Sequence, residues 1–164
     1  MVSFDTGALM AVFDADHPRH DWAREAFRDA DQVLLHPCVL AETSTLLRRR
    51  INGVGKDGNK GARDAIRLLR AEPRCRLIAG IDHDAVTRRY LADHQLSFVD
   101  AVVLELAFRE RTAPVTFDKA IAAHWKKRAS RRKGKPHPDE VASWSEPGFT
   151  SLWSNEADKV WDEL

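Results

Sequence analysis

The segment QVLLHPCVLAETSTLLRRRI, residues 32–51, contains the change of pattern that decides the fold. Residues 32–36 form a compact apolar run with the length of a buried β-strand. Pro37 follows at once and opens a helix over residues 38–51, because proline suits the first helical turn, where an amide hydrogen has no partner. The segment is therefore predicted to be a strand that leads directly into a helix.

The same alternation continues along the chain in both directions. Further strands are predicted at residues 2–4, 75–80 and 113–116. Further helices are predicted at residues 7–13, 19–30, 62–72, 82–94, 96–108 and 118–129. Short apolar strands that alternate with helices indicate an α/β fold, in which helices cover both faces of a parallel sheet. Residues 52–61 include four glycines and are predicted to form a mobile loop.

The 164 residues suffice for one globular domain with a substantial core. No apolar run approaches the ~20 residues of a membrane span, and no basic region precedes the first apolar residues, so we expect a cytoplasmic protein without a membrane partner. Cys38 and Cys75 have no metal-ligand spacing and are expected to remain reduced thiols. The net charge of +1 divides into −5 over residues 140–164 and +6 over the rest, which indicates a basic body that suits a polyanion.

Four acidic residues stand where strands end or helices begin. Asp5 and Asp118 follow the first and last predicted strands. Glu42 lies one to two turns into the helix after the second strand, and Asp100 lies near the start of its own helix. In an open parallel sheet the carboxyl ends of the strands form one rim, where active sites gather. One rim can therefore collect all four carboxylates.

Carboxylates that converge need a counter-charge, because like charges raise one another's pKa. A hard divalent cation such as Mg²⁺ or Mn²⁺ takes oxygen ligands and supplies that charge. Simpler explanations exist, since Asp5 and Asp118 can cap helices and Glu42 can be a surface residue. A cap or surface role is harder to assign to Asp100, because its neighbours in LSFVDAVVLELAF, residues 96–108, include few polar side chains that could pair with its carboxylate.

The segments that contain these acids resemble one known family. FDT at residues 4–6, LAETSTLL at 40–47, LSFVDAVVLELA at 96–107 and PVTFDKAI at 114–121 together resemble the PIN-domain ribonucleases. The closest subgroup is the VapC-like toxins of type II toxin–antitoxin systems, and the resemblance extends from about Val2 to about Trp125. It implies a three-layer α/β/α fold with a central parallel sheet, in a chain that forms homodimers.

The resemblance also implies an activity and a site. By it, the protein is an endoribonuclease that depends on Mg²⁺ (or Mn²⁺), cleaves structured RNA such as tRNA or a ribosomal RNA loop, and leaves a 5′-phosphate and a 3′-hydroxyl. The metal ligands and catalytic acids would be Asp5, Glu42, Asp100 and Asp118. Thr6 and Thr116 match supporting hydroxyl positions, and Ser97 matches a less regular one.

Two groups of basic residues are predicted to contact RNA, because cations around an acidic centre bind the phosphate backbone. The first group, at the far end of the helix that contains Glu42, is Arg48, Arg49 and Arg50. The second group, in the last predicted helix, is Lys126, Lys127 and Arg128. Either group can instead be a solvated helix end whose charges favour the helix dipole.

The end of the chain departs from the VapC-like pattern. We divide the sequence into a nuclease domain at 1–129, a basic linker at 130–139 and an acidic, tryptophan-rich tail at 140–164. The tail, extended or helical, resembles the C-terminal segment of VapB-like antitoxins and is predicted to inhibit the nuclease domain. Its apolar anchors would be Trp144, Phe149, Leu152, Trp153 and Trp161. The alternatives are a separate antitoxin protein as the inhibitor, or a terminal helix that completes the core or a dimer interface.

Two other functions remain open. A catalytically silent PIN-like module would bind RNA or a protein partner through the basic surface without a metal. A metal-dependent phosphohydrolase related to DNA flap nucleases would use a similar scaffold, although the chain is short for a DNA-threading region.

Overall fold

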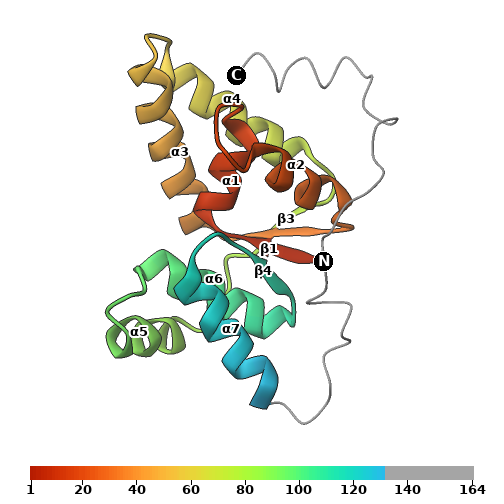
Figure 1. Ribbon diagram of the computed structural model, residues 1–164, viewed down its shortest axis with the longest axis vertical. Helices are drawn as coiled ribbons and strands as arrows, with labels where there is room; N and C mark the ends of the chain where they lie inside the picture. Colours follow the sequence, from red (N-terminus) through yellow and green to blue (C-terminus); the bar gives the residue numbers. More distant parts are fainter. Residues whose placement is uncertain (132–164) are drawn as a thin grey trace.

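The computed structural model describes residues 1–131 and places a parallel β-sheet between two layers of helices (Figure 1). The strands are β1 (Val2–Phe4), β2 (Val33–Leu35), β3 (Cys75–Leu77) and β4 (Ala113–Val115). The helices are α1 (Thr6–Phe13), α2 (His20–Asp29), α3 (Pro37–Gly53), α4 (Gly58–Ala71), α5 (His83–Ala92), α6 (Phe98–Glu110) and α7 (Lys119–Arg131). The predicted three-layer α/β/α fold with a central parallel sheet is confirmed.

The order of the strands is β3–β2–β1–β4, and each neighbouring pair is parallel. Val2 of β1 pairs with Val33 of β2 on one side and with Ala113 of β4 on the other. The chain therefore leaves β1 in one direction to build β2 and β3, and returns to the opposite side of β1 to add β4. In open α/β sheets, ligand sites lie beyond the carboxyl ends of the strands at such a reversal point.

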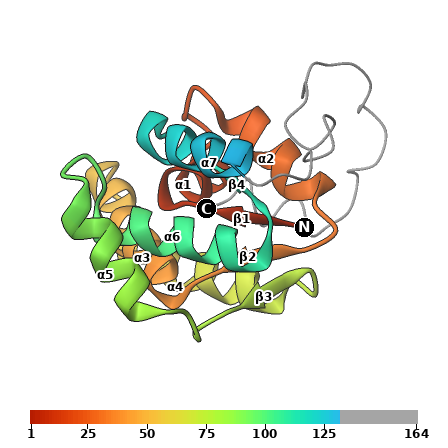
Figure 2. The same cartoon turned by 90° about the horizontal axis from the view of Figure 1, so that it is seen from below.

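Helices α1–α4 cover one face of the sheet and α5–α7 cover the other (Figure 1, Figure 2). The larger core cluster, which includes the fully buried Phe4 and Leu9, lies on the side of α1–α4. On the other side, Leu104 of α6 packs with Ile121 of α7, and neighbouring α6 residues pack with Val86 of α5. Because α6 contacts the sheet and both neighbouring helices, its sequence is apolar almost all round.

The predicted loop at residues 52–61 is wrong for most of its length. α3 continues to Gly53, and α4 already begins at Gly58, where the side chain of Asp57 caps it. Gly58 lies so close to α3 that a Cβ atom there would be 2.2 Å from the carbonyl oxygen of Arg48. The glycine permits two helices to pack closely, a requirement that the sequence alone does not distinguish from a mobile loop.

Predictions about the linker, the tail, the cysteines and membrane spans can be compared with residues 1–131 only. α7 continues to Arg131, so the first two residues of the predicted linker at 130–139 are helical. The rest of that linker and the tail at 140–164 lie outside the described residues. Cys38 and Cys75 are both free thiols. Within residues 1–131, none of the helices has the length and hydropathy that crossing a membrane requires.

Candidate active site

The carboxyl ends of β1 and β4 meet at a pocket of about 390 Å³, which we call the acid pocket. Its walls come from the start of α1, the middle of α3, the start of α6 and the connection from β4 to α7. The lining residues are Asp5, Thr6, Gly7, Glu42, Leu46, Ser97, Asp100, Phe117 and Asp118. The structure thus brings all four predicted carboxylates to one rim of the sheet.

Asp5 is the most buried of the four acids, with 5% of its surface exposed. It caps α1, since its Oδ1 accepts a hydrogen bond of 2.6 Å from the amide of Ala8, and its Oδ2 accepts one from the hydroxyl of Thr116. The pKa of Asp5 is raised from its ordinary 3.8 to about 6, chiefly because burial disfavours the charged form. The hydrogen bonds from Thr116 and Ala8 lower this pKa, whereas the charges of Asp100 and Asp118 raise it further.

Thr116 connects Asp5 to Asp118. While its hydroxyl donates to Asp5, the same oxygen accepts a hydrogen bond of 2.9 Å from the amide of Asp118. Asp118 in turn caps α7, because its Oδ1 accepts from the amides of Ala120 and Ile121 at 2.6 and 3.1 Å. Asp5 and Asp118 are therefore helix caps and pocket residues at once, so the two readings of these acids do not exclude each other.

Glu42 is held by the second supporting hydroxyl. Thr6 of α1 donates a hydrogen bond of 2.5 Å to Oε2 of Glu42, although 36 residues separate the two in sequence. The bond joins the first turn of α1 to α3 and fixes the Glu42 carboxylate in the lining of the acid pocket. Both threonines predicted to support the acids therefore bond directly to one of them.

Asp100 has a polar partner, contrary to what its apolar neighbours led us to expect. It forms a capping box with Ser97, in which the Ser97 amide donates to Asp100 Oδ2 at 2.7 Å and the Asp100 amide donates to Ser97 Oγ at 3.1 Å. The carboxylate lies in the first turn of α6, half-buried and facing the pocket. The apolar run begins one residue later, with Ala101 and Val102 fully buried.

The donor set of the acid pocket fits a hard divalent cation. One carboxylate oxygen of each of Glu42, Asp100 and Asp118 makes no hydrogen bond within residues 1–131, and all the donors are oxygen atoms, as Mg²⁺ and Mn²⁺ prefer. Among residues 1–131, no basic residue is a cause of the shifted pKa of Asp5, and a bound cation would supply the positive charge there. As the side chains stand, no three Asp, Glu, His or Cys residues among 1–131 form a ready ligand cluster.

None of the six basic residues predicted to contact RNA lines the acid pocket. Arg48 and Arg49 are exposed on α3, and Lys126 and Lys127 are exposed on α7. Arg128, also on α7, places its guanidinium 4.3 Å from the ring centre of Phe108. Contact between these residues and RNA stays a prediction.

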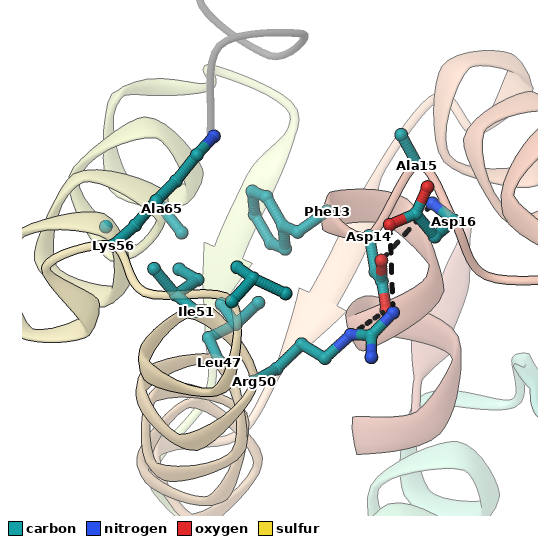
Figure 3. A pocket seen from close by; sticks show the side chains of 11 residues that line it. Phe13, Asp14, Ala15, Asp16, Leu47, Arg50, Ile51, Lys56 and Ala65 are labelled. Carbon is teal, nitrogen blue, oxygen red and sulfur yellow. Dashed lines mark hydrogen bonds and ion pairs between the residues drawn. The ribbon is translucent and has the colours of Figure 1, made fainter.

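Arg50 has a different environment from the other five. Its Nε lies 3.0 Å from Asp14 Oδ2, and a terminal nitrogen lies 3.8 Å from Asp16, so the guanidinium ties α3 to the end of α1 (Figure 3). This ion pair lies at the edge of a second pocket of about 170 Å³, which we call the α3 pocket. Its lining residues are Phe13, Asp14, Ala15, Asp16, Leu47, Arg50, Ile51, Val54, Lys56, Gly61 and Ala65.

Three residues of the acid pocket were missed by the sequence reasoning: Gly7, Leu46 and Phe117. Gly7 and Phe117 are sequence neighbours of predicted site residues, which was the one available signal. Leu46 lies one helical turn after Glu42 on α3, and therefore faces the same side of the helix.

The fold and the acid pocket define a known class of α/β protein. The model of the PIN domain family matches residues 2–126, and the chain therefore belongs to this family. The crystal structure of Mycobacterium tuberculosis VapC20, described as a sarcin–ricin loop cleaving toxin, has the same fold with a TM-score of 0.62. That similarity covers 76% of this chain and 95% of VapC20, at 24% sequence identity. Among curated proteins, no relative matches the chain.

Proposed function

We propose that this chain is an endoribonuclease that depends on Mg²⁺ or Mn²⁺, cleaves structured RNA such as tRNA or ribosomal RNA, and acts in the cytoplasm as the toxin of a toxin–antitoxin system. The observation that carries the proposal is the convergence of Asp5, Glu42, Asp100 and Asp118 on one pocket at the reversal point of the sheet. Membership of the PIN domain family, and a fold shared with a sarcin–ricin loop cleaving toxin, support the same class of reaction.

The four acids would hold the metal, and the hydroxyl groups around them would fix their orientation. When bound, a divalent cation lowers the pKa of water and stabilises the charge that develops on a phosphodiester. Thr116, Thr6 and Ser97 keep the carboxylates of the site in place through the hydrogen bonds described above. Water attacks the phosphorus atom and the bond to the 3′-oxygen breaks, which leaves a 5′-phosphate and a 3′-hydroxyl.

The test is cleavage of a structured RNA with Mg²⁺ or Mn²⁺, with Asp100→Asn as the active-site variant and Asp82→Asn as its control. Asp82 also caps a helix, since its Oδ1 accepts from the Ala85 amide at 2.9 Å, but it lies outside the acid pocket. We expect Asp100→Asn to lower kcat by about 100-fold or more, while Asp82→Asn leaves kcat unchanged. EDTA should abolish cleavage by the native chain. Undiminished RNA binding in EDTA, without cleavage under any condition, would instead indicate a catalytically silent module.

The proposed inhibitor is the acidic tail at 140–164, or a separate antitoxin with a similar segment. The tail lies outside the described residues, and its proposed role rests on its net charge of −5 and its aromatic anchors. The α3 pocket supports the proposal, because Phe13, Leu47 and Ile51 give it an apolar floor (Figure 3). Val54, with 58% of its surface exposed, extends the apolar area, and Lys56 supplies a positive charge, whereas Arg50 is already paired with Asp14 and Asp16.

We also propose a homodimer that uses the outer surface of α5 and the start of α6. Tyr90, Leu91 and Phe98 expose 42%, 76% and 41% of their surface, and the rings of Tyr90 and Phe98 pack edge to face at 5.9 Å. A group of large exposed apolar residues favours a protein contact. Leu91→Glu should convert the dimer to a monomer in analytical ultracentrifugation, and an unchanged mass would contradict the use of this surface.

A further inference from the structure

One wall of the acid pocket is aromatic, and its role is not explained by metal binding. Phe117 lines the pocket between Thr116 and Asp118. The ring of His17, from the segment between α1 and α2, stacks on Phe117 at 5.7 Å with an angle of 17°. Trp22 of α2 packs against the same ring at 5.0 Å. Phe117 is thus fixed from the outside while it faces the acids.

The Phe117 ring also contacts a positively charged side chain, that of Arg19. The guanidinium carbon of Arg19 lies 4.7 Å from the centre of the Phe117 ring, within the range of a cation–π contact. The backbone amide of Arg19 donates to Nδ1 of His17 at 3.1 Å, which fixes the position of this residue at the start of α2. The Arg19 side chain is exposed, and within residues 1–131 its one side-chain interaction is the contact with the Phe117 ring.

An arginine that is held on a wall residue of the acid pocket, and has no ion pair within residues 1–131, has a physical use if the substrate is a polyanion. The acids attract a metal but repel the phosphates on either side of the one that is cleaved. A guanidinium binds phosphate through two parallel N–H bonds, and stacking on a ring holds its plane in place before the ligand arrives. Arg50 cannot serve in this way while it is paired with Asp14 and Asp16.

We infer that Arg19, held on Phe117, binds a phosphate of the RNA strand next to the phosphate that is cleaved. This inference rests on the proposed function and adds a substrate-binding residue to it. Phe117 acts as the positioning residue, because its ring joins the arginine to the wall of the acid pocket.

The experiment measures binding of a fluorescein-labelled RNA stem-loop to the full chain by fluorescence anisotropy over a series of salt concentrations. All proteins contain Asp100→Asn, so that the RNA stays intact. Arg19→Gln should weaken binding by about 5- to 10-fold and lower the slope of log K against log salt by about 1. The control is Arg70→Gln, which removes an exposed arginine of α4 that has no ion pair within residues 1–131, and it should change the affinity by less than about twofold.

Phe117→Leu keeps the charge of Arg19 but removes the ring, and should weaken binding by about threefold. Its melting temperature shows whether the fold is retained. If the parent protein binds RNA and Arg19→Gln behaves like Arg70→Gln, with the same salt slope, Arg19 only packs on Phe117 and the inference is overturned while the proposed function stands. If the parent protein does not bind RNA, and the chain with native Asp100 does not cleave it, the inference about Arg19 and the proposed function are both wrong.

Discussion

The hydroxyl of Thr116 donates a hydrogen bond to Asp5 across 111 residues of sequence. The bond joins the chain after β4 to the chain after β1, and it is the strongest of the interactions that lower the pKa of Asp5. Burial nevertheless keeps that pKa at about 6, close to neutrality. The charge of Asp5, and with it the proposed affinity for a metal, depends on how well Thr116 is placed.

Thr116→Val should shift the pH dependence of RNA cleavage. Without the hydrogen bond from Thr116, the ionised form of Asp5 is less favoured, so the pKa of Asp5 rises above about 6. The acidic limb of the profile of kcat/KM should therefore move to higher pH. Thr45→Val is the matched control, since the Thr45 hydroxyl bonds to the carbonyl of Ala41 on the exposed side of α3. A profile that does not move would show that Asp5 does not control the acidic limb.

Asp5→Asn should stabilise the metal-free fold at neutral pH. The pKa of Asp5 in the folded chain lies above its ordinary 3.8, so its favourable contribution is complete below about pH 3.8 and is lost as the pH rises through about 6. Asparagine keeps the helix cap without a charge. In EDTA, the free energy of unfolding of the variant should exceed that of the native chain by about 3 kcal/mol above pH 6, and the two should agree below pH 3.8.

Mg²⁺ should affect the stability of the native chain and of Asp5→Asn differently. A ligand that binds only the folded state raises its stability, so Mg²⁺ should stabilise the native chain and leave Asp5→Asn unchanged. Denaturant unfolding at acidic and neutral pH, with and without Mg²⁺, measures both effects. Greater stability of the native chain in EDTA at neutral pH would contradict the raised pKa of Asp5.

Gly58→Ala should destabilise the hairpin of α3 and α4. The new Cβ would lie 2.2 Å from the carbonyl oxygen of Arg48, which is backbone and cannot turn away. We expect a loss of about 1–3 kcal/mol in the free energy of unfolding, seen as a lower melting temperature. Gly53→Ala is the control, because a Cβ at Gly53 meets nothing within 4 Å. Equal melting temperatures of the two variants would mean that the helices separate without cost.

Removal of the tail should expose the nuclease. A chain that ends at Asp139 is expected to cleave RNA on the order of 10-fold faster than the full chain, because a tethered inhibitor acts at high effective concentration. Val54→Glu should raise the cleavage rate of the full chain and leave that of the shortened chain unchanged, since it affects only the α3 pocket, where the tail is proposed to bind. If the shortened chain unfolds and cleaves no faster, the tail belongs to the core instead.

The sequence alone predicts the position of a site residue where a local sequence pattern determines that position. Asp5 and Asp118 follow the ends of adjacent parallel strands, so the strand prediction already placed them at one rim. Ser97 and Asp100 carry the spacing of a capping box, S-x-x-D, which explains the acid at the start of an apolar helix. The spacing is visible in the sequence, but the apolar neighbours of Asp100 favour the different expectation of an acid with little polar contact.

Other features depend on contacts that no local pattern contains. The sequence predicts a loop at Gly58, because close packing against the backbone of Arg48 arises only when two helices meet. The pairing of Arg50 with Asp14 and the stacking of Arg19 on Phe117 depend on where the segment after α1 turns. Such contacts join residues from different elements, and composition and periodicity do not specify them.

The place of β4 beside β1 has a consequence for synthesis of the chain. β1 leaves the ribosome first, but its partner on that side, together with Thr116 and Asp118, emerges more than 100 residues later. A nascent chain that stops before residue 113 holds Asp5, Glu42 and Asp100 without the strand that completes their pocket. Translation therefore leaves the acid pocket incomplete until the last strand inserts, so the order of the strands itself delays the formation of the site.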